Sequence, residues 1–425
     1  MEIIESKKEF DYFWSKYQTS KAGPVIYYVF SDIHLHPAHN RISFLCVRLD
    51  VDYILPFNHN DALNLPIEYL DRLKTENKKY VWNKKNLLHQ IDFKHMVDIS
   101  TLLYLETNKD YNDIDEDDNY ISFWDYKFPN QKNLNDYIPL LKHYEYIKKH
   151  MDDNIFNDEF LNSRYDYMTR LLYNIEKNGI LKNDQLVYTQ YNNFTSTGRP
   201  SNRFGGMNFA ALNKTDGSRK QFISRFGSKG KLVEFDYDAY HLRLIADVLD
   251  FELPKTSVHE YFAKIYGITY KEAKVLSFKY LYGGVPFDIG KNIEFFGKVK
   301  GFVKKLWKLY IKDKYIESYI YRKKIYSSNM SDMNKNKLFN YFIQNLETER
   351  NMEVLNNLLP KIKKYKSKLV LYNYDSFLFD FHIDDDLKCL QTIKSILEHN
   401  GRYPVKVHWG ENYHKMEDIT EKFEA

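Results

Sequence analysis

Alternating apolar and polar runs divide the chain into strand-like and helix-like segments. Residues 25–30, VIYYVF, form an apolar run rich in β-formers and predict a buried strand, with residues 41–57 as its hairpin partner. Residues 78–106 mix a short strand with helices. This pattern predicts a small α/β domain over residues 1–133.

Apolar residues at helical spacing dominate residues 134–178. The remainder alternates strand-like and helix-like runs up to residue 425. A chain of 425 residues is too long for one simple core. We therefore expect a helical connector over residues 134–194 and a larger mixed domain over residues 195–425.

Two strand-like runs lead directly into aspartates. Asp236 and Asp238 follow the apolar run KLVEF and precede a helical pattern, and residues 367–381 predict a hairpin with Asp375 near its turn. One explanation is a surface turn with an aspartate as helix N-cap. The other is a metal site, because a buried carboxylate is costly unless it is paired or bound to an ion. Two carboxylates converging on one sheet would suit a pair of divalent ions.

Composition narrows the class of protein. The hydrophobic content of 43% is sufficient for globular cores, and two cysteines, Cys46 and Cys389, exclude a disulfide framework and a cysteine-based zinc set. The N-terminus lacks the regions of a signal peptide, and no apolar run is long enough to cross a bilayer. These features predict a cytoplasmic protein with no membrane partner.

The net charge of +4 conceals an uneven distribution. Residues 298–324 hold ten lysines and arginines against two acids, with aromatic residues among them. This composition suits a phosphate-rich partner, but a solvated helix face would have the same pattern. The sequence leaves both interpretations open.

A series of motifs decides between the two explanations of the aspartates. In chain order they are TSTGRPSN (195–202), GSRKQFISRF (217–226), FDYDAYHLR (235–243), SVHEYFAKIYG (257–267), EAKVLSFKYLYGG (272–284), FNYFIQNLETER (339–350), YNYDSF (372–377) and GENYHKM (410–416). In this order the series resembles the polymerase domain of family A DNA polymerases, which include bacterial DNA polymerase I and phage replicases. The resemblance covers roughly residues 160–425. It implies a mixed α/β fold with an antiparallel palm sheet and helical fingers over about residues 252–335.

The resemblance assigns the metal and catalytic residues. Asp236 and Asp375 would be catalytic and would bind two Mg²⁺ ions, for which Mn²⁺ could substitute, and the backbone carbonyl of Tyr237 would be a further ligand. Ser376 and Tyr374 stand where the family usually has a glutamate and a histidine. The family's glutamate is often treated as auxiliary, so its absence weakens the inference of activity without excluding it.

The resemblance also assigns a nucleotide site. Lys274, Phe278 and Tyr282 are spaced to share one helix face, with the lysine on the triphosphate and the aromatics on base and sugar. Lys271 could replace the charge of an arginine that the family has four residues before the lysine. His241 stands where a glutamate usually excludes ribonucleotides. Its imidazole could either block a 2′-hydroxyl or hydrogen-bond to it, and the sequence does not give the ring orientation.

For a third set of residues the resemblance implies contacts with primer–template DNA. Minor-groove acceptors are largely shared between base pairs, so contacts there check pair shape without reading sequence. Arg219 and Lys220 are expected at phosphates. The full DNA-binding set is Arg199, Asn208, Arg219, Lys220, Asn340, Gln344 and Tyr374.

The N-terminal domain resembles the RNase H-like 3′–5′ exonuclease of these polymerases, but its motifs are altered. The strand that usually carries Asp-x-Glu carries Asp32-x-His34, and Leu87 and Leu141 stand in place of two further aspartates. Of the set, Asp32 and Tyr137 are retained. A two-metal site without three of its carboxylates should not hold its ions, so we expect a degenerate exonuclease domain and no proofreading.

The family's helical thumb is the second departure. Only a short polar stretch separates Ile180 from Thr197, which is too short for a helical hairpin. The resemblance therefore implies a polymerase without a thumb. Fewer phosphate contacts would weaken its grip on the duplex unless a processivity partner replaces the thumb.

The sequence predicts DNA synthesis from dNTPs on a primer 3′-hydroxyl, and three alternatives stay open. The chain could be a catalytically weak nucleic-acid-binding or replisome scaffold protein, as the altered motifs allow. Template-dependent RNA synthesis is a second alternative, because His241 replaces the usual sugar gate. A zinc site at His34, His36 and His39 is a third, although histidines this close are more often incidental.

Overall fold

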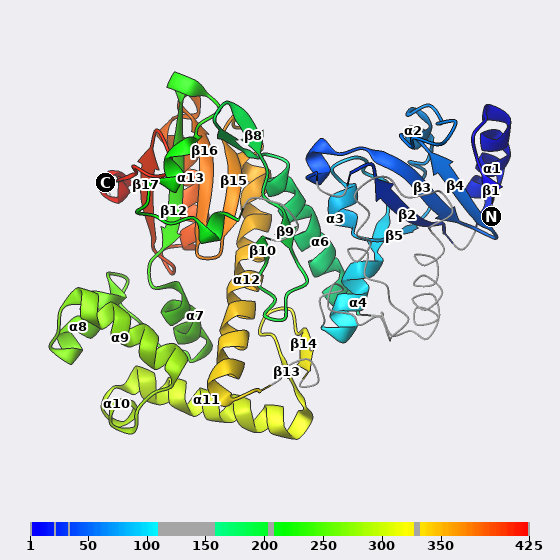
Figure 1. Ribbon diagram of the computed structural model, residues 1–425. Helices are drawn as coiled ribbons and strands as arrows, with labels where there is room; N and C mark the ends of the chain where they lie inside the picture. The colour runs from blue at the N-terminus through cyan, green and yellow to red at the C-terminus, as the bar shows by residue number, and fades with distance from the viewer. Residues whose placement is uncertain are drawn as a thin grey trace. The chain divides into compact units, whose positions relative to one another are not determined.

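The computed structural model describes residues 2–20, 23–32, 35–108, 158–202, 208–326 and 332–423. The chain forms two compact units: the first is Met1–Lys177, and the second joins Asn178–Asn202 to Met207–Ala425 (Figure 1). The predicted division into three domains stays a prediction. In the described residues, no helix combines the length and the apolar composition that a membrane span requires.

A six-stranded sheet forms the centre of the first unit, in the order β1-β4-β3-β2-β5-β6. Strands β2, β3 and β4 pair antiparallel, whereas β5 pairs parallel to β2 and β6 parallel to β5. The apolar run predicted as a strand is β2. The strands are β1 (Glu2–Ile3), β2 (Val25–Phe30), β3 (Ile42–Arg48), β4 (Asp52–Pro56), β5 (Lys79–Val81) and β6 (Met96–Asp98).

Helices of the first unit enclose one apolar core. Helix α1 begins with a capping box of Ser6 and Glu9 and buries Phe10, Phe13 and Tyr17 against the sheet. Leu87, which stands in place of an exonuclease aspartate, is fully buried in the same core. Within the described residues of this unit, the helices are α1 (Lys7–Thr19), α2 (Tyr69–Arg72), α3 (Lys84–Leu87), α4 (Ile99–Thr107) and α6 (Glu159–Glu176).

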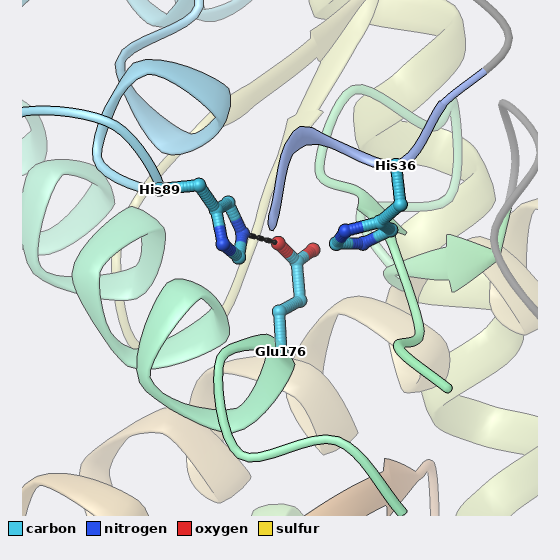
Figure 2. A group of neighbouring side chains, drawn as sticks. All are labelled: His36, His89 and Glu176. Atoms are coloured by element: carbon cyan, nitrogen blue, oxygen red, sulfur yellow. Dashed lines mark hydrogen bonds and ion pairs between the residues drawn. The ribbon is translucent and has the colours of Figure 1, made fainter. Parts of the chain in front are cut away.

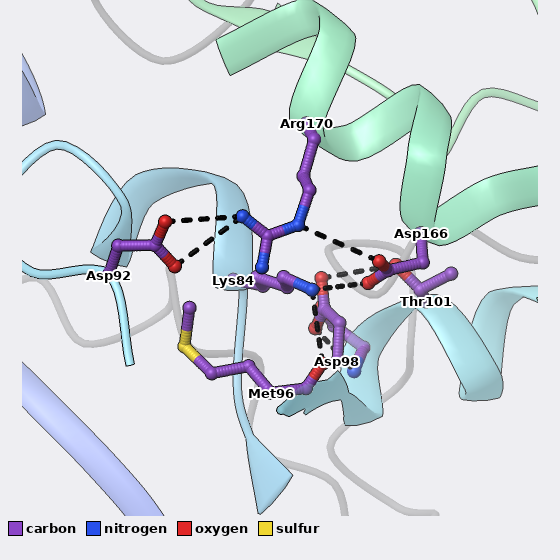
Figure 3. Close-up of polar contacts among 8 residues, drawn as sticks. Lys84, Asp92, Met96, Asp98, Thr101, Asp166 and Arg170 are labelled. Carbon is purple, nitrogen blue, oxygen red and sulfur yellow. Dashed lines mark hydrogen bonds and ion pairs between the residues drawn. The ribbon is translucent and has the colours of Figure 1, made fainter. Parts of the chain in front are cut away.

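A charged network fastens α3 to α6 (Figure 3). The buried ammonium of Lys84 forms an ion pair with Asp166 and donates a hydrogen bond to the Met96 carbonyl at 3.0 Å. Arg170, one turn further along α6, lies 3.8 Å from Asp166 and 3.3 Å from Asp92. These contacts hold the last described helix of the unit against its sheet.

The second unit is built on a five-stranded antiparallel sheet in the order β15-β16-β12-β17-β18. Strand β12 is central, and its Leu232, Val233 and Phe235 are fully buried. The predicted hairpin over residues 367–381 is present as β15 and β16. The strands are β12 (Gly230–Tyr237), β15 (Lys368–Asn373), β16 (Ser376–His382), β17 (Val405–Gly410) and β18 (Glu417–Asp418).

Most helices of the second unit lie between strands β12 and β15 in the chain, and one follows β16. Helix α12 is long and buries residues along most of its length, and α9 begins with a capping box of Thr269 and Glu272. A short hairpin of β13 (Tyr315–Glu317) and β14 (Lys324–Tyr326) follows α11. The helices are α7 (Tyr240–Val248), α8 (Val258–Tyr266), α9 (Tyr270–Gly283), α10 (Phe287–Asn292), α11 (Glu294–Asp313), α12 (Lys335–Ile362) and α13 (Asp386–Glu398).

The basic stretch of the sequence lies largely on α11. This helix buries Phe295, Val299 and Leu306, while Lys304 and Lys308 are exposed. Part of the apolar set therefore turns inward as in an amphipathic helix, while Leu309 and Ile311 are exposed together with the lysines. The same face remains available to a phosphate-rich partner.

The stretch between α6 and the TGR motif is described throughout and holds only short strands. These are β7 (Ile180–Lys182), β8 (Gln185–Val187) and β9 (Tyr191–Asn192). Strand β7 pairs with β8 and with β11 (Phe222–Ile223), and β9 pairs with β10 (Ser201–Asn202). No helix lies between Glu176 and Asn202, so this stretch contains no helical hairpin.

Candidate active site

A cavity of about 730 Å³ in the second unit is lined by most of the predicted site residues. Its walls come from the edge of the sheet at β12 and the β15–β16 turn, from α9 and from α12. Asn208, Lys220, Lys271 and Tyr374 are not among the lining residues. Those that line it are Arg199, Arg219, Asp236, Tyr237, His241, Lys274, Phe278, Tyr282, Asn340, Gln344 and Asp375.

The two predicted catalytic aspartates lie close to each other, Asp236 on β12 and Asp375 in the β15–β16 turn. Asp236, near the end of β12, pairs in register with Ser376, the residue after Asp375. The backbone N–H of Tyr237 donates a hydrogen bond to the Asp375 carbonyl at 3.0 Å. This main-chain bond joins the two segments at the floor of the cavity.

The alternative of an aspartate N-cap is wrong. The N-cap residue of α7 is Ala239, at φ 53°, and no side chain caps the helix. Asp238 instead lies 3.3 Å from Lys406 and 3.6 Å from Arg243. The aspartates after β12 therefore do not serve to start the helix.

The turn that carries Asp375 has a strained residue. Tyr374 has φ 63°, a left-handed conformation that is unfavourable for an aromatic residue. Asn351 of α12 donates a hydrogen bond to the Tyr374 carbonyl at 2.7 Å, and the guanidinium of Arg199 lies 3.8 Å from its ring centroid. Contacts from two directions thus hold the turn in this conformation and fix the position of Asp375.

Asp236 is half-buried, and Asp375 is exposed at the cavity that both residues line. Burial and repulsion from Asp375 and Glu234 raise the pKa of Asp236 to about 7. Burial, with repulsion from Glu347, also raises the pKa of Asp375. Among the described residues, the ion pairs of the cavity do not include either aspartate. Crowded carboxylates that repel each other and form no direct ion pair are the donor set that a divalent ion would satisfy.

Glu347, which the sequence reasoning missed, is the central acid of the opposite wall. It is fully buried on α12, and its two oxygens lie 2.7 Å from Arg199 Nη2 and 3.1 Å from His241 Nε2. Burial raises the pKa of Glu347, but His241 and Arg199 together lower it more, so its pKa lies below its usual value. The other nitrogen of His241 is hydrogen-bonded to the Tyr282 hydroxyl.

The predicted nucleotide residues of α9 present one face to the cavity. Phe278 and Tyr282 stack with ring centroids 5.9 Å apart and an interplanar angle of 6°. Lys274 lines the cavity one turn earlier. Lys271 lies in the first turn of the helix and is exposed outside the cavity.

Further basic residues line this side of the cavity. Lys214, His259 and Lys406 are all among its walls. Burial lowers the pKa of His259 to about 4, so the ring is neutral near pH 7. The signal for His259 was present in the motif SVHEYFAKIYG, whereas Lys406 is found only through its pairing opposite Asp236 in the sheet. Positive charge here thus comes from Lys406 on a strand and Lys214 in a loop, in addition to Lys274 on α9.

The predicted DNA-binding residues have different environments. Asn340 and Gln344 of α12 line the cavity. The guanidinium of Arg219 donates to the Leu212 carbonyl at 3.0 Å and lies 4.4 Å from the Tyr413 ring centroid, so much of its bonding capacity is used within the protein. Lys220 is exposed, and the exposed Asn208 caps a single 3₁₀ turn by accepting a hydrogen bond from Ala211.

A second polar cluster lies in the first unit, where His36, His89 and Glu176 approach one another (Figure 2). Each offers one ligand atom, and these atoms lie within 4.8 Å of one another. Glu176 also forms an ion pair with the buried ammonium of Lys85 at 2.6 Å, and its pKa is lowered because Lys85 and His89 outweigh the effect of burial.

The ion pair with Lys85 already compensates the carboxylate of this cluster. The Glu176 carboxylate only accepts hydrogen bonds, so His89 Nε2, 2.9 Å away, carries a proton. His36 Nδ1 accepts from the Ala38 amide at 3.0 Å, which leaves the proton of the neutral ring on Nε2. The cluster is therefore a charge-compensated network that ties α3 to the end of α6. His39, which belonged to the zinc alternative, is outside it.

Few of the exonuclease positions lie within the described residues. The Asp32 amide donates to Asn40 Oδ1 at 3.2 Å, and its carbonyl accepts from the same side chain. Leu87 belongs to the hydrophobic core. His34, Tyr137 and Leu141 lie outside the described residues.

The chain has the fold of a DNA polymerase domain. It is similar to the structure titled "POL domain of Pol1 from M. smegmatis complex with DNA primer-template and dNTP", with a TM-score of 0.73 and 13% identity, over 97% of this chain and 99% of that chain. The likeness confirms the predicted mixed α/β fold, with an antiparallel sheet and helices in the second unit. No protein-family model and no curated protein sequence matches the chain.

Proposed function

We propose that the protein is a DNA-directed DNA polymerase that transfers nucleotides from dNTPs to a primer 3′-hydroxyl. The observation that carries the proposal is the convergence of Asp236 and Asp375 with Lys274, Phe278 and Tyr282 around one cavity. Their motifs resemble family A polymerases, and the fold is that of a polymerase domain. A carboxylate pair facing a lysine and two aromatic rings suits a nucleoside triphosphate.

The carboxylates fit divalent ions. Asp236, Asp375 and the Tyr237 carbonyl would hold them, with Mg²⁺ as the expected metal and Mn²⁺ as a substitute. When bound, such ions supply Lewis acidity and charge neutralisation at the reacting phosphate. The raised pKa of Asp236 supports this assignment, because the free site holds more negative charge than it can stabilise. Ser376 has no carboxylate to add, so the site depends on two acidic side chains.

The other cavity residues bind and orient the substrates. Lys274 places a positive charge for the triphosphate, and the stacked rings of Phe278 and Tyr282 offer a surface for the base and sugar. Asn340 and Gln344 present amides to the minor groove of the primer–template, where acceptors are shared by all base pairs. Such contacts favour correct pair shape on any template.

The N-terminal domain supports synthesis without proofreading. His34, Leu87 and Leu141 stand where the family's exonuclease has acidic residues. Of these, Leu87 belongs to the hydrophobic core, and the other two lie outside the described residues. With the missing helical thumb, these changes favour a phage-like family A enzyme that depends on a replication partner to stay on DNA.

Primer extension tests the proposal directly. The purified chain is incubated with Mg²⁺, a labelled primer–template and either dNTPs or NTPs. Extension by dNTPs that is lost in Asp236→Asn supports a polymerase. Duplex binding without extension under Mg²⁺ or Mn²⁺ would instead support a scaffold protein.

A further inference from the structure

The ring of His241 is held from two helices other than its own. Its Nδ1 is hydrogen-bonded to the Tyr282 hydroxyl on α9, and its Nε2 lies 3.1 Å from Glu347 Oε1 on α12. We propose that Glu347 is a positioning residue that fixes this ring, so that His241 excludes ribonucleotides by steric clash and not by hydrogen bonding. The inference rests on the proposed function and specifies the sugar selectivity of the same site.

The protonation state of Glu347 determines the tautomer of the ring. Glu347 is a carboxylate at neutral pH because His241 and Arg199 stabilise its charge, despite full burial. A carboxylate only accepts, so the facing Nε2 of His241 carries a proton. The other nitrogen, Nδ1, is hydrogen-bonded to the Tyr282 hydroxyl and so also faces a protein group.

Both ring nitrogens therefore face protein groups: Nδ1 is hydrogen-bonded to Tyr282, and Nε2 lies at ion-pair distance from Glu347. A 2′-hydroxyl that reached the ring would meet carbon–hydrogen edges, or would have to displace Glu347 or Tyr282. Placing a hydroxyl without a partner in a desolvated site is unfavourable, and a site lacking a partner discriminates against it. Sequence alone does not show whether His241 repels a 2′-hydroxyl or binds it. These two contacts favour exclusion.

Glu347 can hold the ring because its remaining charge is compensated. Arg199 Nη2 lies 2.7 Å from the second oxygen of Glu347. Arg199 is itself placed by the loop at Gly198, which has φ 69°, and where a Cβ would clash with the Asn345 side chain. The arginine, the glutamate and the histidine thus form one chain of contacts along the wall of the cavity.

The test is the ratio of kcat/KM for dNTP to kcat/KM for the matching NTP. Glu347→Gln keeps the shape but removes the charge that faces Nε2, and should lower this ratio about 3- to 10-fold, the usual effect of losing one polar contact. Extension with dNTP should fall much less. His241→Ala should lower the ratio at least as far.

A double-mutant cycle separates positioning from general disturbance. If Glu347 acts through His241, then Glu347→Gln should change the ratio by less than about twofold in a His241→Ala background. Multiplicative effects of the two substitutions would overturn the inference, and so would an unchanged ratio in Glu347→Gln.

Two further variants complete the experiment. Tyr282→Phe keeps the stacking ring, releases Nδ1 and should also lower the ratio, so it carries the test if Glu347→Gln does not fold. Arg199→Lys keeps a positive charge beside Glu347. It should alter primer–template affinity while leaving the ratio within about twofold. A lower dNTP-to-NTP ratio in Arg199→Lys but not in Tyr282→Phe would overturn the role of the ring.

The outcomes also separate this inference from the proposed function. A wild-type protein that fails to extend primers with either nucleotide refutes the polymerase. If the wild-type protein extends primers with dNTPs and the Glu347→Gln variant has the same ratio as wild type, only the positioning role is refuted. A wild-type preference for NTPs would overturn exclusion by His241.

Discussion

The backbone amide of Tyr237 donates a hydrogen bond to the carbonyl of Asp375 at 3.0 Å, although the two residues are far apart in the sequence. Because this bond is between main-chain atoms, it does not depend on the acidic side chains beside it. It holds the end of β12 to the β15–β16 turn, so that Asp236 and Asp375 meet in one cavity. Neutral variants of the aspartates should therefore keep the fold.

Removing either carboxylate charge should abolish synthesis. Asp236→Asn and Asp375→Asn are expected to lower turnover by orders of magnitude, because each would remove an ionic ligand from a two-metal site. Primer extension under single-turnover conditions measures the effect. Asp250→Asn, an exposed change in the same unit, serves as control. Near wild-type extension by a folded Asp236→Asn protein would contradict the assignment of this aspartate.

Metal dependence should shift with pH. The pKa of Asp236 is raised to about 7, so below this pH a proton competes with the ion for the carboxylate. We expect the Mg²⁺ concentration for half-maximal binding to rise by up to about tenfold per unit as pH falls below 7. Isothermal titration between pH 6 and pH 8 checks this without relying on activity. A pH-independent affinity would exclude Asp236 as a titrating ligand.

Glu176 should be essential for the stability of the first unit. Glu176→Gln leaves the buried ammonium of Lys85 without its charge partner, which typically costs about 3–5 kcal/mol. Because folding lowers the pKa of Glu176, its contribution is present at neutral pH and is lost as pH falls through the folded pKa. The difference between variant and wild type should therefore shrink in acid.

Thermal and urea unfolding at two pH values measure this contribution. Glu159→Gln, an exposed change on the same helix, should cost no more than about 1 kcal/mol. Equal stabilities of wild type and Glu176→Gln at neutral pH would show that the carboxylate is dispensable.

The protein should not trim mismatched primers. The altered N-terminal motifs retain Asp32 but lack three carboxylates at the matching positions, too few for a pair of ions. A labelled primer with a 3′ mismatch should stay intact with Mg²⁺ or Mn²⁺ when dNTPs are absent. Trimming that disappears in Asp32→Ala would show that the domain retains its nuclease.

Binding to primer–template should be weak and sensitive to salt. With no helix between Glu176 and Asn202, the duplex loses the phosphate contacts that a helical thumb supplies. We expect short products per binding event when a trap captures released enzyme, and a steep loss of affinity as salt rises. Long products from the isolated chain under single-hit conditions would indicate that another part of the protein holds the duplex.

The sequence by itself determined the elements whose patterns are local. The apolar run of β2, the hairpin that carries Asp375 and the shared face of Lys274, Phe278 and Tyr282 all follow from short-range periodicity and turn residues. The order of motifs also predicted the polymerase fold and a common site for Asp236 and Asp375. These predictions needed only neighbouring residues and their order along the chain.

Only the tertiary structure decided which charges are buried and what they face. Charged side chains are mostly exposed, so nothing local marks Glu347 as a fully buried acid between Arg199 and His241. Lys406 reaches the cavity through its register with Asp236 across the sheet. The orientation of the His241 ring, which the sequence left open, depends on two other helices. Such contacts join residues far apart in the chain, and folding brings them together through packing that no short stretch of sequence encodes.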